Sequence, residues 1–335
     1  MKKISSMLRK IFAPQYLMIW VLLVMVIGLS IASPAFRSPS NLVEILRSAG
    51  IYAVMVLGLT WIVALGEIDV SFPEVAAFAS VVVAYLVVKD IPWFFAIIIA
   101  IGVSALWGLF SGVLINVFKA RALIASIAVA TIAKACAYII GKGSPIYVPV
   151  INPTVNFLVY GKLAGIPVLL IIVVVLYVLA AFIQNQTKLG QYLYALGENR
   201  QAALEAGIPE KKIIYAFYIL SAAMAAFAGS LMVAAYTSGQ PNFVGAYFID
   251  GLTAVFLGAL VIKIGKPNVV GTFIGAIMIM VISNGSTLLG IQFYVGTIVK
   301  GILMVIGVAV ISYSRTRSEK RYRAERLAAS AAATD

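Results

Sequence analysis

The chain contains no histidine and one cysteine, Cys136, and only 11% of its 335 residues are charged. Histidine is the most common metal ligand and the usual general base of enzymes, so we expect no catalytic residue, no metal site and no cofactor. A single cysteine excludes a disulfide within the chain. Because Cys136 lies in an apolar run, we interpret it as a small packing residue.

A nucleotide-binding loop is also missing. The two candidates are Gly141-Lys142-Gly143 and Gly265-Lys266-Pro267. Both lack the Ser or Thr that follows the lysine of a P-loop. Both also lack a glycine five residues before the glycine that precedes the lysine. The chain therefore has no nucleotide site of its own, and an ATP-driven step would need a separate subunit.

The sequence is rich in long apolar runs. Hydrophobic residues make up 63% of the chain and the mean hydropathy is +1.06, whereas soluble domains are about half apolar and about a quarter charged. Several runs exceed the roughly 20 residues that cross a bilayer, and their continuous hydrophobicity is typical of helices. We predict an all-α polytopic membrane protein with about ten transmembrane helices, at 16–32, 42–65, 73–88, 92–118, 121–140, 166–183, 212–237, 249–262, 269–289 and 294–312. The first run resembles a signal peptide, but its length favours an uncleaved first span.

Basic residues give the predicted orientation. The formal net charge is +13; with the N-terminus inside, 18 of the 25 lysines and arginines fall on inner segments and 5 on outer segments. Positive charge collects on the cytoplasmic side of membrane proteins, so we place both termini and the central loop in the cytoplasm. This topology accounts for the charge without a nucleic-acid partner, and the basic tail, 313–335, is expected to lie along the anionic inner leaflet of the lipid bilayer.

The predicted spans divide into two halves that begin on opposite sides of the membrane. Spans two to five begin outside and spans seven to ten begin inside, which predicts two inverted repeats. A Gly-x-x-x-Gly pair occurs in the fourth span, starting at Gly108, and another in the ninth, starting at Gly271. Lys134 and Lys300 each lie about six residues from the outer end of the fifth and tenth spans.

The longest polar interruption is the central insert, residues 184–212. Asn199 is a candidate N-cap of a short helix, Gly207 suits the left-handed position that ends it, and Pro209 fits the first turn of the next helix. A helix of two turns needs a partner surface in order to be stable. Two interpretations remain open: a solvated loop, or a segment that docks into another protein.

The insert resembles a known family signature. Ala202-Ala203, three residues and Gly207 match the Glu-Ala-Ala-x-x-x-Gly pattern of permease subunits of ATP-binding cassette importers, with Gln201 in place of Glu. The wider run 190–229 resembles the ribose/sugar-type permeases. The resemblance implies a coupling helix that seats in a separate ATPase subunit, with contacts from Asn199, Gln201, Ala202, Ala203, Glu205 and Gly207.

The same resemblance implies the other components of the transporter. It implies a single permease domain, 1–312, in a bacterial inner membrane, paired with a second permease copy. Solute, a sugar or a similar small polar molecule, would be delivered by a periplasmic solute-binding protein.

A second polar segment, Gly66 to Glu74, carries three carboxylates between two apolar runs. Ser71 and Glu74 have the spacing of a capping box, so the chain is predicted to leave one helix at Gly66 and start another at Ser71. The segment resembles the Gly-Gly-Ile-Asp-Leu-Ser-Val-Gly motif of sugar-type permeases, with Glu67 in place of a glycine. Broken helices can line a solute route, which makes Glu67, Asp69 and Ser71 candidate translocation residues; the alternative is an ordinary cytoplasmic turn.

The remaining translocation candidates are Lys134, Lys300 and Asn284. A lysine within a span is costly unless it is paired, faces water, or extends to the interface. For Lys134 the candidate partners are Glu67, Asp69 or Asp250. One hypothesis places both lysines in a positive ring near the outer mouth of a passage. Asn284-Gly285 resembles the Asn-Gly pair of the family, although hydrogen bonding between helices would also explain Asn284.

Other functions stay open at this point. An ion-coupled secondary transporter would use Lys134 with Asp69 or Asp250. An ATP-binding cassette permease for branched-chain amino acids or nucleosides would share the same scaffold. A membrane enzyme is the weakest alternative, because no nucleophile and base are paired in the sequence.

Overall fold

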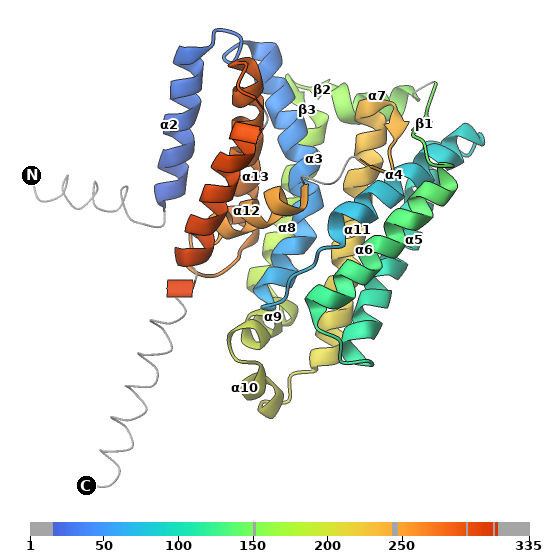
Figure 1. The fold of residues 1–335 in the computed structure, drawn as a ribbon, viewed down its shortest axis with the longest axis vertical. Coiled ribbons are helices and arrows are strands. Elements are labelled where there is room, and N and C mark those ends of the chain that lie inside the picture. Colours follow the sequence, from blue (N-terminus) through green and yellow to red (C-terminus); the bar gives the residue numbers. More distant parts are fainter. Residues whose placement is uncertain (1–15, 150–151, 243–246, 293, 311, 314–335) are drawn as a thin grey trace, which may run out of the picture.

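The computed structural model describes residues 16–149, 152–242, 247–292, 294–310 and 312–313. These residues form a bundle of helices with only two short antiparallel strand pairs, β1 with β4 and β2 with β3 (Figure 1). The helices are α2 (Leu17–Ala32), α3 (Pro39–Ala64), α4 (Phe72–Val88), α5 (Trp93–Asn116), α6 (Ala122–Ile140), α7 (Pro153–Tyr160), α8 (Val168–Gln186), α9 (Lys188–Glu198), α10 (Arg200–Glu205), α11 (Glu210–Tyr236), α12 (Tyr247–Gly258), α13 (Val269–Leu288) and a helix at Tyr294–Val310. The strands are β1 (Ile146–Tyr147), β2 (Lys162–Leu163), β3 (Ile166–Pro167) and β4 (Ser238–Gly239).

A helix lies at each of the ten predicted spans, so the all-α polytopic class is confirmed. Six helices, α3, α5, α6, α8, α11 and α13, are long and apolar enough to cross a membrane. Four others, Met18–Ala32, α4, α12 and Tyr294–Val310, are apolar but shorter. Ten spans and the inverted repeat therefore stay predictions. The basic tail lies outside the described residues, apart from Tyr313.

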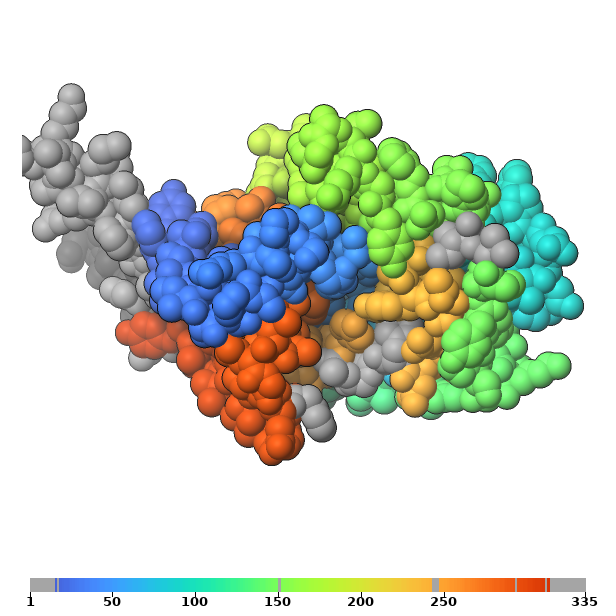
Figure 2. Space-filling model, turned by 90° about the horizontal axis from the view of Figure 1, so that it is seen from above, coloured from blue at the N-terminus to red at the C-terminus, as the bar shows by residue number. Residues whose placement is uncertain are grey.

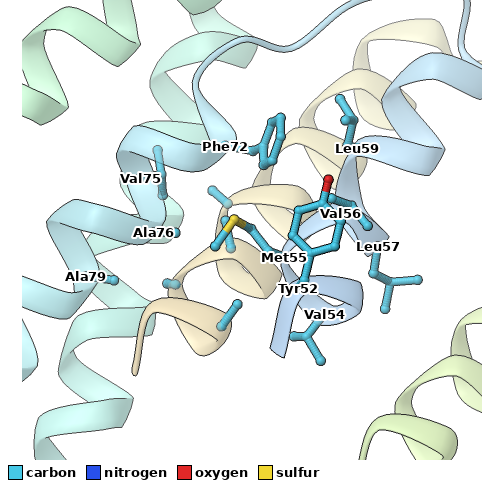
Figure 3. Packing of buried hydrophobic residues seen from close by; sticks show 14 of the residues in the cluster. Tyr52, Val54, Met55, Val56, Leu57, Leu59, Phe72, Val75, Ala76 and Ala79 are labelled. Atoms are coloured by element: carbon cyan, nitrogen blue, oxygen red, sulfur yellow. The ribbon is translucent and has the colours of Figure 1, made fainter. Parts of the chain in front are cut away.

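The centre of the bundle is formed by α3 and α11. About two thirds of the most apolar stretch of each is buried, against 28% for α5 and α8. Figure 3 shows this core from close by, with Tyr52 and Met55 of α3 beside Phe72 at the start of α4. These two central helices are therefore surrounded by protein, while the outer helices expose an apolar face.

Small residues allow the helices to approach closely. A Cβ on Gly108 of α5 would overlap the backbone of Tyr218 on α11, and one on Gly275 of α13 would overlap the carbonyl oxygen of Ala254 on α12. Both Gly-x-x-x-Gly pairs thus serve helix packing, as such spacing does in membrane helices.

The two ends of the bundle differ. One end carries α9 and α10, and α10 extends beyond the ends of the other helices (Figure 1). The opposite end, seen in Figure 2, is covered in part by the segment that contains α7 and the β2–β3 pair. The central insert is therefore confined to one end.

The chain between α3 and α4 does not form the capping box that the sequence predicted. Ser71 is the N-cap of α4 but has helical backbone angles (φ −80°, ψ −21°), and its side chain makes no capping bond. Its hydroxyl donates to Asp69 instead, and Glu74 pairs with Lys134. The break itself is confirmed, with Gly66 at φ +82°.

Candidate functional site

The insert folds as two short helices, α9 and α10, and the local signals for α10 are confirmed. The side chain of Asn199 accepts a hydrogen bond from the N–H of Ala202 at 3.1 Å. Gly207 has φ +78°. The N–H of Gly207 donates to Leu204 and that of Ile208 donates to Ala203, which is the Schellman pattern of a helix end. Both ends of this six-residue helix are therefore fixed by their own chain, and Pro209 precedes α11 as its N-cap.

One face of α10 is held and the others are open. Ala203 is the buried residue of this helix and packs on the main core. Gln201, Ala202, Glu205 and Gly207 are exposed, and Gln201 donates to Glu205 along the helix at 3.0 Å. The predicted coupling residues other than Ala203 thus form a small exposed surface at the end of the bundle; Figure 1 shows α10 there.

The insert is anchored to the chain between α12 and α13. The hydroxyl of Tyr194 donates to the carbonyl oxygen of Pro267 at 2.8 Å, and Lys266 forms an ion pair with Glu198. Burial, together with the charge of Glu198, raises the pKa of Tyr194 to about 12, so this hydroxyl stays a donor at neutral pH. Gln184 accepts from the N–H of Val269 at 2.9 Å.

The insert is also anchored to the break before α4. Arg200, the first residue of α10, forms ion pairs with Glu67 at 2.8 Å and with Glu210, the first residue of α11. Burial lowers the pKa of Arg200, but its bonds to Glu210 and Glu67 outweigh burial and leave the pKa raised. Glu67, proposed for the solute route, is thus joined to the insert.

The other two residues of the break point elsewhere. Asp69 is 3% exposed, and its Oδ1 accepts from the backbone N–H of Ser71 at 2.8 Å and from the Ser71 hydroxyl at 2.6 Å. The hydroxyl of Ser126 on α6 accepts from the N–H of Val70 at 3.1 Å. Asp69 and Ser71 therefore hold the shape of the break, and the structure does not bring them to Lys134.

The predicted partners of Lys134 were wrong. Its Nζ lies 3.5 Å from Oε1 of Glu74 in the first turn of α4, while Asp250 in the first turn of α12 pairs with Lys300 at 2.7 Å. Each lysine faces a carboxylate, so the two do not form an uncompensated positive ring. Glu74 was missed because the capping-box pattern offered a local role for it, and the sequence signal was an acid in the first turn of both short helices.

These two pairs locate the starts of α4 and α12. Lys134 lies 12 residues into α6, or about 18 Å along its axis, and Lys300 lies six residues into its helix, or about 9 Å. The first turns of α4 and α12 therefore lie well inside the lengths of α6 and of the helix at Tyr294–Val310, respectively. Phe72 of α4 and Gly251 of α12 meet there, since a Cβ on Gly251 would overlap the Phe72 ring edge at 2.6 Å.

Asn284 lies apart from these groups. It exchanges two hydrogen bonds with Asn41 of α3, at 3.0 and 2.9 Å. Its amide is thus used to join α13 to α3, which is the alternative role that interhelical packing predicts.

Two cavities flank the break before α4. One, of about 440 Å³, is lined by residues 66–68, the α5–α6 connection 115–123, Arg200 and Glu210. The other, of about 190 Å³, shares these three residues and is also lined by Phe256 and Pro267. Among the described residues, no group of three Cys, Asp or Glu side chains is placed to hold a metal ion.

Comparison with known proteins agrees with this architecture. A family model described as "branched-chain amino acid transport system / permease component" matches residues 41–308. The ribose import permease protein of Bacillus subtilis (strain 168) is 32% identical over 289 residues, which cover 86% of this chain and 89% of that protein. Those of Haemophilus influenzae (strain Rd) and Escherichia coli (strain K12) are 30% identical over 298 and 308 residues, covering 88% and 90% of this chain and 92% and 96% of theirs. No solved structure matches the chain. The chain therefore belongs to this family of multi-pass membrane permease components.

Proposed function

We propose that this protein is the transmembrane subunit of an ATP-binding cassette importer for a sugar or a similar small polar solute. The observation that carries the proposal is α10: a short helix with both ends capped, one buried alanine and an exposed outer surface at one end of the bundle. Such a helix is suited to dock into a partner. We assign Asn199, Gln201, Ala202, Ala203, Glu205 and Gly207 to the contact with a separate ATPase subunit, which hydrolyses the ATP.

Sugar is favoured as the solute because the relatives of highest identity reported above are named ribose import permeases. The family description names branched-chain amino acids, so that class is the second candidate. A periplasmic binding protein would supply affinity and a second permease copy would complete the passage, in a bacterial inner membrane with both termini in the cytoplasm.

The two ion pairs support the proposed inverted repeat and a solute route. Lys134–Glu74 joins the fifth predicted span to the third, and Lys300–Asp250 joins the tenth to the eighth. In each half, an ion pair therefore joins the fourth predicted span of that half to the second. Charged side chains at membrane depth face protein or water, and half-helix starts are typical of transporter binding regions. We therefore place the route along the first turns of α4 and α12.

Co-purification tests the partner. The double variant Ala203→Glu, Gly207→Glu buries a charge under α10 and forces a side chain into a left-handed position, so it is expected to abolish capture of the cognate ATPase and ATP-dependent uptake of labelled D-ribose. Ala164→Glu, in an exposed loop at the opposite end, is the matched control and should behave as the unmodified chain. Capture and uptake at the normal rate in the double variant, or uptake driven by an ion gradient without the ATPase, would refute the proposal. Calorimetry of the binding protein with D-ribose and with L-leucine separates the two solute classes.

A further inference from the structure

The insert rests directly on the break before α4. A Cβ on Gly197, in the last turn of α9, would overlap the carbonyl oxygen of Ala64, the last residue of α3. Gly66 lies against the same glycine, with its Cβ position 3.7 Å from the Gly197 oxygen. At this glycine the backbones of α9 and of the end of α3 are in direct contact.

Three residues beyond Gly197, Arg200 joins three elements. It is the first residue of α10, and its guanidinium binds Glu67 in the break and Glu210 at the start of α11. Arg200 is half exposed, whereas the carboxylates are 22% and 17% exposed, so water screens the group only in part. A guanidinium offers donors in a fixed fork, which lets one side chain hold two carboxylates in a defined geometry.

From Glu67 the chain continues into α4 through a segment that is held by hydrogen bonds. Val70 is bonded to Ser126, and Ser71 is bonded to Asp69 through both its N–H and its hydroxyl. Phe72 then packs against Gly251 at the start of α12. A displacement of Glu67 would therefore be passed to the place where the two short helices meet.

The break also has space to move. Residues 66–68 line both the cavity of about 440 Å³ and the cavity of about 190 Å³. Glu67 therefore borders open space as well as Arg200.

We propose that Arg200 is a positioning residue that ties the ATPase-docking helix α10 to the break before α4 through Glu67, with Glu210 fixing its orientation. This inference rests on the proposed function, because it assumes that an ATPase moves α10. The motif that this segment resembles has glycine at position 67, and glycine could not form the pair. The link is thus a feature of this chain's own residues.

A cysteine reporter tests the link without any solute. In a Cys136→Ala background, Ile68→Cys places a thiol at a half-buried position that lines both cavities. The rate of labelling by a membrane-impermeant maleimide is measured in the complex with the ATPase, with and without MgATP and vanadate. The rate is expected to change severalfold on trapping, and Glu67→Ala or Arg200→Ala is expected to remove that change while vanadate still traps nucleotide on the ATPase.

Two further variants guard against trivial explanations. Glu44→Ala removes a comparable ion pair, with Arg47, far from the insert, and should leave the labelling change intact. The triple inversion Glu67→Arg, Arg200→Glu, Glu210→Arg keeps both pairs with opposite charge and should restore the change that either alanine variant loses.

The outcomes separate the two proposals. If the unmodified chain neither captures nor stimulates the ATPase, the proposed function fails. If it does both, and Ile68→Cys responds equally with and without Glu67, or does not respond at all, then only the role of Arg200 is overturned. If an alanine variant assembles poorly, Arg200→Lys, which keeps the charge but not the fork, should show a reduced labelling change, and a full change would equally overturn it.

Discussion

The two lysine–carboxylate pairs differ in how far they are removed from solvent. Lys300 and Asp250 are 12% and 10% exposed and lie 2.7 Å apart. Lys134 and Glu74 are 40% and 17% exposed and lie 3.5 Å apart, and the second carboxylate oxygen of Glu74 is buried without a hydrogen-bond partner among the described residues. The two halves of the chain thus use the same kind of pair in a closed and in a loose form.

The difference suggests a division of roles. A closed, buried pair loses much if one partner is removed, because the other charge is left unpaired. A pair that is longer and less covered by protein contributes less to stability and can separate at smaller cost. We therefore expect the pair between α12 and the last helix to maintain the fold, and the pair between α4 and α6 to be the one that can open during transport.

Removing Lys300 should give the largest effect. Lys300→Met leaves Asp250 buried without a counter-charge, which costs about 3–5 kcal/mol of stability for such a group. The thermal unfolding midpoint of the detergent-solubilised protein is expected to fall clearly. The double variant Lys300→Met, Asp250→Leu removes both charges and should recover much of the loss.

Lys134→Met is the matched control for that comparison. Its cost is expected to be clearly smaller, because Lys134 is 40% exposed and lies 3.5 Å from Glu74. A loss in Lys134→Met as large as that in Lys300→Met would show that the two pairs are equivalent and would contradict the proposed division.

Local features of the fold could be predicted from the sequence, but contacts between distant residues could not. The helices were predictable because each apolar run is a local feature, and the cap at Asn199 and the end at Gly207 depend on neighbours within a few residues. The partner of Lys134 was not predictable, because it depends on how α4 packs against α6. The Asn41–Asn284 pair joins residues 243 apart, and the sequence holds no local sign of it.

The contacts of Arg200 also could not be predicted from the sequence. Its charge was used in the topology argument, but its binding to Glu67 and Glu210 depends on α9 seating against the end of α3. α10 was correctly predicted as a separate short helix, yet neither its local signals nor the resemblance indicated which residues it binds.

The glycine contacts of the two halves provide a second, smaller test. Gly108→Ala pushes α5 from α11 and Gly275→Ala pushes α13 from α12, since in both cases the added Cβ would meet backbone. Overpacking of this kind costs about 1–3 kcal/mol. Both variants should lower the unfolding midpoint, whereas Gly102→Ala, which meets nothing within 4 Å, should not lower it. An unchanged midpoint in Gly108→Ala or Gly275→Ala would mean that the neighbouring helix can move aside for the added methyl group.

The smallest expected effect concerns the cap of α10. Asn199→Ala removes the side-chain acceptor for the N–H of Ala202 and should cost about 1 kcal/mol, enough to fray a six-residue helix but not the bundle. Global unfolding should therefore stay unchanged, while amide hydrogen exchange at 200–206 rises and ATPase capture weakens. Asn152→Ala, which removes the equivalent cap of α7 at the opposite end, should leave capture intact. Because both caps are alike in chemistry and differ only in place, unaltered capture in Asn199→Ala would mean that α10 need not be preformed to bind its partner.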